Sequence, residues 1–137
     1  MTKLTALEKL QQALPASFHM LEPAKAKNMK ATTMVLPSPL DVAQAIAKIP
    51  YGQTVTTIEL QRVLAIGGNA ETACPAKINH YWKLLALATE EQQEGAAPYM
   101  IPWWRVLNRK GKPSPSMPGG VEAHISRLQA EGIDLAH

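Results

Sequence analysis

The sequence predicts a mainly α-helical fold: a three-helix, winged helix-turn-helix-like domain with a short strand segment and an N-terminal helical extension. Capping residues mark two helix starts, at Ser38 and Thr56. A turn-rich segment, residues 65–75, separates the second helix from a third. The apolar residues 106–107 suit a short strand after these helices. A chain of 137 residues is long enough for one such domain with an appendage.

Residues 1–37 are predicted to form an N-terminal helix and a proline-rich extension. Residues 1–14 space their leucines helically, and Thr5 with Glu8 can form a capping box. The leucines of that apolar face are Leu4, Leu7, Leu10 and Leu14. From residue 15 to residue 39 the pattern dissolves into prolines around the basic stretch KAKNMK, which predicts an extended segment.

The main domain is predicted to span residues 38–137 and to open with two capped helices. Ser38 followed by Pro39 suits an N-cap and a first helical position, and this helix stops at the turn of residues 50–52. Thr56 and Glu59 have the capping-box spacing at the start of the second helix. The predicted inward residues of the two helices are Val42, Ala45, Ile46 and Ile49, then Leu60, Val63 and Leu64.

A third helix is predicted from residue 75 to residue 89, followed by a polar loop at residues 89–98. Its inward residues are Ile78, Trp82 and Leu85, with Tyr81 as a further candidate, and its outward residues are Lys77, His80 and Lys83. Two helices joined by a turn, the second with a polar outer side, form the outline of a DNA-binding helix-turn-helix unit. A final helix, residues 121–131, is predicted to place Val121, Ile125 and Leu128 inward and to end at Gly132.

Composition predicts a protein that stays inside the cell and binds an anionic partner. No apolar run approaches the roughly 18 residues of a membrane span, and the N-terminus lacks the apolar core of a secretory signal, so we expect a cytoplasmic protein without membrane contact. The single cysteine, Cys74, and four scattered histidines predict neither a metal site nor a cofactor. The net charge is +3, and four cations without an acidic neighbour suit phosphate contacts: Arg105, Arg109, Lys110 and Lys112.

Four motifs occur in an order that resembles a known family: IPYGQTVTT at residues 49–57, IPWWRVLNRKGK at 101–112, PGG at 118–120 and LQAEGIDL at 128–135. Over residues 42–135 the chain resembles the C-terminal domain of O6-alkylguanine-DNA alkyltransferases, and more closely their non-catalytic relatives, the alkyltransferase-like proteins. The resemblance implies that the chain binds double-stranded DNA containing alkylated guanine, rotates the base into a pocket and flags the lesion for nucleotide excision repair proteins. We expect it to act as a monomer.

The catalytic residues of the transferases are replaced in this chain. The family's PCHRV motif, whose cysteine takes the alkyl group and whose histidine activates it, corresponds here to Pro102, Trp103, Trp104, Arg105 and Val106. The position of the glutamate that orients the histidine is occupied by Ile125. Because alkyl transfer requires an activated thiolate, we predict no enzymatic activity and no catalytic residue. We interpret Cys74 as a small residue in a turn.

The resemblance makes Trp103 the predicted wall of the base pocket, where stacking on an indole contributes roughly 1–3 kcal/mol. Adjacent residues of an extended segment face opposite ways, so Trp104 is predicted to pack in the core. Arg105 is expected to hold the loop through backbone carbonyls. The predicted base pocket comprises Trp103, Arg105, Pro102, Met100 and Thr57. The residues expected to contact DNA are Thr56, Ala76, Lys77, Asn79, His80, Lys83, Arg109, Lys110 and Lys112.

Departures from the family pattern leave a second interpretation open. Thr57 replaces the tyrosine that helps to rotate the nucleotide, and Asn79 replaces a glycine of the third helix. An arginine finger falls on Ala76 or Lys77, and lysine lacks the flat guanidinium that stacks in the vacated space. The stretch TEEQQEG, residues 89–95, has the character of an acidic insertion. The alternative is a diverged relative that has lost lesion recognition and serves as a general DNA-binding or protein-interaction module.

Overall fold

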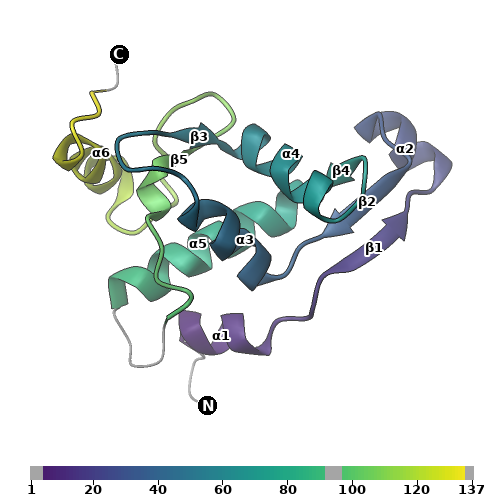
Figure 1. Cartoon of the computed structure of the whole chain (residues 1–137), viewed down its shortest axis with the longest axis horizontal. Helices are drawn as coiled ribbons and strands as arrows, with labels where there is room; N and C mark the ends of the chain where they lie inside the picture. Colours follow the sequence, from purple (N-terminus) through teal and green to yellow (C-terminus); the bar gives the residue numbers. More distant parts are fainter. Residues whose placement is uncertain (1–4, 92–96, 135–137) are drawn as a thin grey trace.

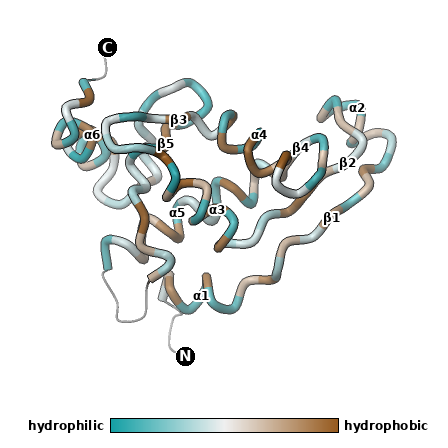
Figure 2. The backbone as a smooth tube through the Cα atoms, viewed as in Figure 1, coloured by the Kyte–Doolittle hydropathy of each residue, from teal (hydrophilic) through white to brown (hydrophobic). Residues whose placement is uncertain are grey.

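Helix α5, Pro75–Glu91, is the element on which three other helices pack (Figure 1). The computed structural model describes residues 5–91 and 97–134. Helices α1 (Ala6–Gln12), α3 (Pro39–Ala47) and α4 (Thr57–Gly67) all contact α5. Hydrophobic residues recur along α3, α4 and α5 (Figure 2), and the almost fully buried core includes Val42, Ile46, Ile78 and Leu85. Helix α5 ends at Glu91, two residues beyond its predicted end at residue 89. Residues 92–96 of the predicted loop lie outside the described part of the chain.

The N-terminal helix is present in a shortened form. Thr5 caps it, and Leu7 and Leu10 are buried as predicted. Leu14 is 78% exposed, so its predicted place on the apolar face is wrong. The reason is that the helix ends two residues earlier, which breaks the helical spacing. Leu4 lies outside the described residues.

A three-stranded sheet occupies much of the segment predicted to be extended without regular structure. Strand β1 (Ser17–Met20) pairs antiparallel with β2 (Thr33–Leu36), and β2 pairs in parallel with β4 (Thr72–Ala73). The short helix α2 (Pro23–Met29) connects β1 and β2. The prediction missed the β-branched and apolar run of β2, which buries Met34 and Val35. Since β4 belongs to the predicted main domain, the sheet connects the N-terminal extension to that domain. The domain boundary at residue 38 stays a prediction.

The predicted N-cap at Ser38 and the predicted capping box at Thr56 are both present, and Ser38 forms a full capping box with Asp41. The Ser38 hydroxyl accepts a hydrogen bond from the Asp41 amide at 3.2 Å, and the Asp41 carboxylate accepts one from the Ser38 amide at 3.0 Å. The same exchange joins Thr56 and Glu59 at the start of α4, at 3.3 Å and 3.2 Å. The helix-turn-helix therefore begins at the residue that the sequence indicates.

The inward faces of α4 and α6 (Gly120–Ala130) differ from the prediction at single positions. Val63 is 55% exposed because it lies about 100° around the helix from the buried Leu64. In α6, Val121 is 37% exposed and His124 is completely buried. His124 and Leu128 share one helix face because they are four residues apart.

The short strand predicted at residues 106–107 is confirmed. Strand β5 (Val106–Leu107) pairs in parallel with β3 (Val55–Thr56), which places the residues before β5 beside the turn that precedes β3, and the residues after β5 beside the start of α4. Those residues, Trp103–Arg105, form a single 3-10 turn, η1, and not the expected extended segment. Gly132 ends α6 with a left-handed φ of +77°. The mainly α-helical, helix-turn-helix-like fold is confirmed, with strands as well as a helix in the N-terminal extension. None of the helices in the described ranges is long and apolar enough to cross a membrane.

Candidate nucleic-acid interface

The outward side of α5 carries the polar residues predicted to face DNA. Its exposed members are Ala76, Asn79, His80 and Lys83. Lys77 is half-buried, because its Nζ lies 5.8 Å from the centre of the Tyr81 ring. The inward residues are buried as predicted: Ile78, Tyr81, Trp82 and Leu85. This separation leaves one side of α5 open to a partner.

The loop after β5 is folded into a tight turn that presents three cations. The side-chain oxygen of Asn108 accepts hydrogen bonds from the amides of Lys110 and Lys112, at 2.9 Å and 3.0 Å. Gly111 supplies the positive φ, +75°, that the turn needs. Arg109, Lys110 and Lys112 are exposed, and their side chains form no ion pair with any described residue. Their positive charge is therefore available to an anionic partner.

A cavity of about 420 Å³ lies between α5 and this loop. The α5 side of its lining comprises Asn79, His80, Trp82 and Lys83, and the loop side comprises Asn108, Ser114, Ser116 and Met117. Small-molecule sites commonly enclose about 300–1,000 Å³ and combine an apolar lining with a few polar groups. Helix α5 and the loop thus form one concave surface rather than two separate ones.

A smaller cleft, of about 40 Å³, lies between the starts of α4 and α5, and Thr57, Asn79 and Arg109 are among its lining residues. Thr57 is 6% exposed, and its hydroxyl has no hydrogen-bond partner among the described residues. A buried hydroxyl without a partner costs about 1–3 kcal/mol, so a ligand atom that reached it would gain a hydrogen bond. Thr56, in contrast, already uses its hydroxyl to cap α4.

The two tryptophans have the opposite exposure from the predicted one. Trp103 is 0% exposed and lies in the core, whereas Trp104 is only half-buried. Alternation of sides applies to extended backbone, and residues 103–105 form a 3-10 turn instead. The Trp103 carbonyl accepts a hydrogen bond from Trp82 Nε1 at 3.0 Å. The prediction of Trp103 as an open pocket wall is therefore wrong, whereas Trp104, although half-buried, packs against the hydrophobic core as predicted.

Arg105 connects the 3-10 turn η1, residues 103–105, to two other segments; this turn is called the tryptophan turn. Its Nη1 donates to the Ile49 carbonyl at 2.8 Å, as predicted, and its Nε and Nη2 each donate to the Glu131 carboxylate at 2.9 Å. Glu131 also accepts hydrogen bonds from Trp104 Nε1 at 2.6 Å and from the Gly52 amide at 2.9 Å. Burial raises the pKa of Glu131, but these hydrogen bonds and the charge of Arg105 outweigh it and hold the pKa below its ordinary value.

Sequence reasoning missed Glu131, although an acidic residue directly before the glycine that ends a helix was a usable signal. Two more contacts surround the side chains of Trp104, Arg105 and Glu131. The Arg127 guanidinium lies 4.9 Å from the Trp104 ring centre and pairs with Glu90 at 2.6 Å. The Tyr51 ring lies 5.5 Å from the Arg105 guanidinium. The segment around Trp104 is thus held from several sides by charge-assisted contacts.

His124, also missed from the sequence, joins the cavity loop to the tryptophan turn. Its Nδ1 accepts a hydrogen bond from the Ser114 amide at 3.1 Å, so the ring proton lies on Nε2 and is donated to the Trp104 carbonyl at 2.9 Å. Burial lowers the pKa of His124 below its ordinary value of 6.5, against opposing hydrogen bonds at the Trp104 and Val106 backbone. The neutral ring therefore fixes one end of the loop that lines the cavity.

Two of the predicted base-pocket residues, Thr57 and Met100, are not brought together. Thr57 lies with Ile78 at the start of α5, whereas the segment before η1 is fixed to its end by Thr89, whose hydroxyl accepts from the Ile101 amide at 3.0 Å. About 15 Å of helix rise separates these two positions, which excludes Met100 from a pocket that includes Thr57. Pro102 is half-buried, and it lines neither the cavity nor the cleft.

The cavity contains no candidate nucleophile of the transferase type. Cys74 has a free, half-buried thiol and lines neither the cavity nor the smaller cleft. Ile125, at the family's glutamate position, is half-buried. Within residues 5–91 and 97–134, no three His, Cys, Asp or Glu side chains are grouped so that they could hold a metal ion.

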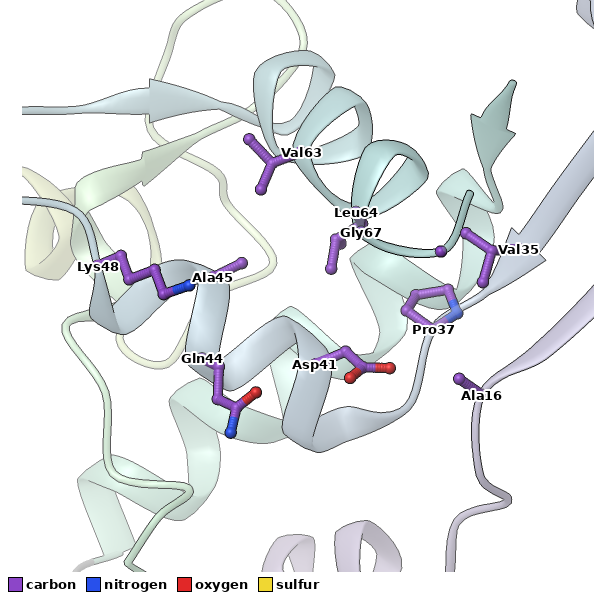
Figure 3. A pocket seen from close by; sticks show the side chains of 11 residues that line it. Ala16, Val35, Pro37, Asp41, Gln44, Ala45, Lys48, Val63, Leu64 and Gly67 are labelled. Atoms are coloured by element: carbon purple, nitrogen blue, oxygen red, sulfur yellow. The ribbon is translucent and has the colours of Figure 1, made fainter. Parts of the chain in front are cut away.

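A separate groove of about 340 Å³ runs between α3 and α4 (Figure 3). Asp41, Gln44 and Ala45 line it from α3, and Val63, Leu64 and Gly67 line it from α4. None of the predicted DNA contacts lines this groove. It is therefore distinct from the surface formed by α5 and the loop.

Comparison with known proteins places the chain in a family. The family model described as 6-O-methylguanine DNA methyltransferase, DNA binding domain, matches residues 38–133, well over half of the 137 residues. Among solved structures, a crystal structure of S. pombe Atl1 in complex with damaged DNA containing O6-carboxymethylguanine is similar, with a TM-score of 0.47 and 22% identity over 70% of this chain and 76% of that chain. No curated protein sequence matches the chain. The chain belongs to the family of 6-O-methylguanine DNA methyltransferase DNA-binding domains.

Proposed function

We propose that this protein recognises O6-alkylguanine in duplex DNA without repairing it, and that the complex flags the lesion for nucleotide excision repair proteins. The observation that carries the proposal is the cavity between the outer side of α5 and the loop after β5, the loop that also presents three exposed cations. Membership of a DNA-binding-domain family supports DNA as the partner. The monomeric state and the cytoplasmic location stay predictions.

In this proposal the loop cations attract the duplex and the cavity receives the damaged base. Arg109, Lys110 and Lys112 bind phosphates without regard to sequence. Rotating a base out of the duplex costs a few kcal/mol, and less where damage has weakened its pairing. The cavity offsets this cost through the polar groups of Asn79 and Asn108 and the apolar surface of Met117.

The buried residues of the tryptophan turn support the cavity from beneath. Trp103 holds Trp82, which lines the cavity, through the hydrogen bond between the Trp82 indole and the Trp103 carbonyl. His124 holds Ser114 on the opposite wall. Trp103 therefore contributes to base binding through the shape of the site and not through stacking on the base.

No alkyl transfer accompanies binding in this proposal. The cavity lining offers amides, hydroxyls, an imidazole and an ammonium group, but no thiol that could attack an alkyl carbon. The lesion therefore leaves the site chemically unchanged. Intact-mass measurement after incubation with an O6-methylguanine duplex tests this point, and a mass gain of one methyl group on the protein would contradict it.

Fluorescence anisotropy with an O6-methylguanine duplex and its unmodified twin tests recognition. The variant Ser116→Trp fills the cavity from an exposed loop position, and Ser126→Trp places the same side chain on the exposed side of α6 as a control. We expect the wild type and Ser126→Trp to bind the damaged duplex more tightly. Ser116→Trp should bind both duplexes equally. Equal binding of both duplexes by the wild type would overturn lesion recognition.

The second candidate is a diverged domain that binds DNA generally or mediates protein interactions. The complete burial of Trp103 favours it, because the indole that the family resemblance assigns to base contact is withdrawn into the core. It predicts the same affinity and the same salt dependence for damaged and undamaged duplexes. The anisotropy experiment therefore distinguishes the two candidates.

A further inference from the structure

The N-terminal extension carries a second group of cations, on α2. Lys25, Lys27 and Lys30 are exposed, and their ammonium groups form no ion pair within the described residues. Lys27 lies in the last turn of α2, and Lys30 follows the helix directly as its C-cap, in a left-handed conformation with a φ of +54°. No residue of α2 is buried, so these side chains do not serve the core.

The sheet fixes α2 to the turn of the helix-turn-helix. Directly after α2, the Thr32 amide donates to the Glu71 carboxylate at 2.6 Å, and the Glu71 amide donates to the Thr33 hydroxyl at 2.9 Å. The Cys74 amide then donates to the Val35 carbonyl at 2.9 Å, one residue before α5 begins. The α2 lysines are therefore held at a defined place beside the turn that precedes β4, and the parallel pairing of β2 with β4 puts the start of α5 at the opposite end of β2.

The two groups of cations lie on different sides of the helix-turn-helix. Figure 1 shows α2 at one end of the molecule, beyond α4 and β4, whereas β5 and the loop that follows it lie toward the other end. Duplex DNA carries a phosphate about every 3.4 Å along each strand, so a duplex on α5 continues past the turn that precedes this helix. There its phosphates meet the next unpaired cations on α2.

We infer that Lys27 and Lys30 of α2 form a second phosphate-binding surface, which contacts duplex DNA beside the lesion site. The inference rests on the proposed function, because it requires a duplex on α5. The composition of α2 favours DNA over a membrane surface. A membrane-surface helix needs bulky apolar residues such as Trp, Phe or Leu on one side, and α2 (PAKAKNM) has none of these.

The test is the salt dependence of duplex binding, measured by anisotropy on long and short duplexes. The variant Lys27→Gln/Lys30→Gln removes two charges from α2, and Lys9→Gln/Lys48→Gln removes two exposed charges from α1 and from the end of α3. On a duplex of about 20 base pairs, the slope of log affinity against log salt should fall by about 1.8 in the α2 variant only. On a duplex of about 10 base pairs, one helical turn, the α2 variant should match the wild type.

The outcomes separate this inference from the proposed function. A slope on the long duplex that is the same for the α2 variant and the wild type would overturn the α2 surface while leaving lesion preference intact. A reduced slope without any lesion preference would support the α2 surface and remove lesion recognition. Failure of the wild type to bind either duplex would overturn both.

Discussion

The outer side of α5 and the tryptophan turn lie on either side of the Trp82 side chain and use their polar groups in opposite ways. On α5 and the loop after β5, the cavity is lined by four exposed polar side chains, Asn79, His80, Lys83 and Ser116. In the tryptophan turn, Arg105 and Glu131 bind each other, and the Trp104 indole donates to the same carboxylate. The polar groups of α5 and the loop are available to a ligand, whereas those of the tryptophan turn stabilise the fold.

This difference separates the residues that hold the site from the residues that meet the partner. Trp103 and Trp104 have structural roles, since both make internal contacts and their rings meet edge to face at 5.8 Å. Recognition is then left to α5 and the loop. Substitutions in the tryptophan turn should therefore change stability, whereas substitutions on the outer surface should change binding.

Replacement of Trp103 should have the largest effect. Trp103→Ala removes a 0% exposed indole from the core and should lower the free energy of unfolding by about 3–5 kcal/mol. Urea denaturation followed by circular dichroism measures this. Arg109→Ala, at an exposed position, is the control and should stay within about 0.5 kcal/mol of the wild type. A loss below about 1 kcal/mol for Trp103→Ala would show that the indole is not a core residue.

Removal of the charge at Glu131 should have the next largest effect. Glu131→Gln weakens the ion pair with Arg105 and should cost about 2–3 kcal/mol of stability at neutral pH. Because folding lowers the pKa of this carboxyl, its contribution is present above the ordinary value of 4.5 and is lost as the pH falls below it. Urea midpoints measured from pH 3 to pH 7 should decrease less steeply toward acid pH in the variant than in the wild type. The same decrease in both proteins would contradict the assignment.

Protonation of His124 should lower stability in a higher pH range. Folding lowers its pKa, so the unfolded chain binds more protons as the pH falls below about 6.5, and stability should decrease there by up to about 1.4 kcal/mol per pH unit. Protonation also removes the acceptor for the Ser114 amide. His124→Gln should flatten stability between pH 5 and pH 7, while His80→Gln, at an exposed position, should not. The same slope in both variants would refute this role.

A single loop cation should have the smallest effect. Arg109→Gln should reduce the salt slope of duplex binding by about 0.9 and change stability by less than about 0.5 kcal/mol. Anisotropy over a salt series measures the slope, with Lys9→Gln as the control. Equal slopes for Arg109→Gln and the wild type would remove Arg109 from the DNA contacts.

The sequence predicted the parts of the fold that depend on local signals. Ser38 and Thr56 mark helix starts because a cap is satisfied within four residues. The exposed side of α5 follows from helical spacing alone. The fold class and the family follow from the order of these elements and from the motifs.

The missed features depend on contacts between residues far apart in the chain. Glu131 meets Arg105 across 26 positions, and β2 meets β4 across the helices α3 and α4. The predicted exposure of the two tryptophans depended on whether the backbone of residues 103–105 is extended or forms a 3-10 turn. No nearby residue in the sequence indicates which of these conformations it adopts. His124 was missed because helical spacing assigned the inward position to its aliphatic neighbour, Ile125.

The most direct test is the ratio of the affinities of the wild-type protein for one duplex with and without O6-methylguanine at a fixed salt concentration. Recognition by the cavity predicts at least tenfold tighter binding of the damaged duplex, about 1.4 kcal/mol, and loss of that preference in Ser116→Trp. A ratio of one, with salt-dependent binding to both duplexes, would contradict lesion recognition and leave a general DNA-binding domain.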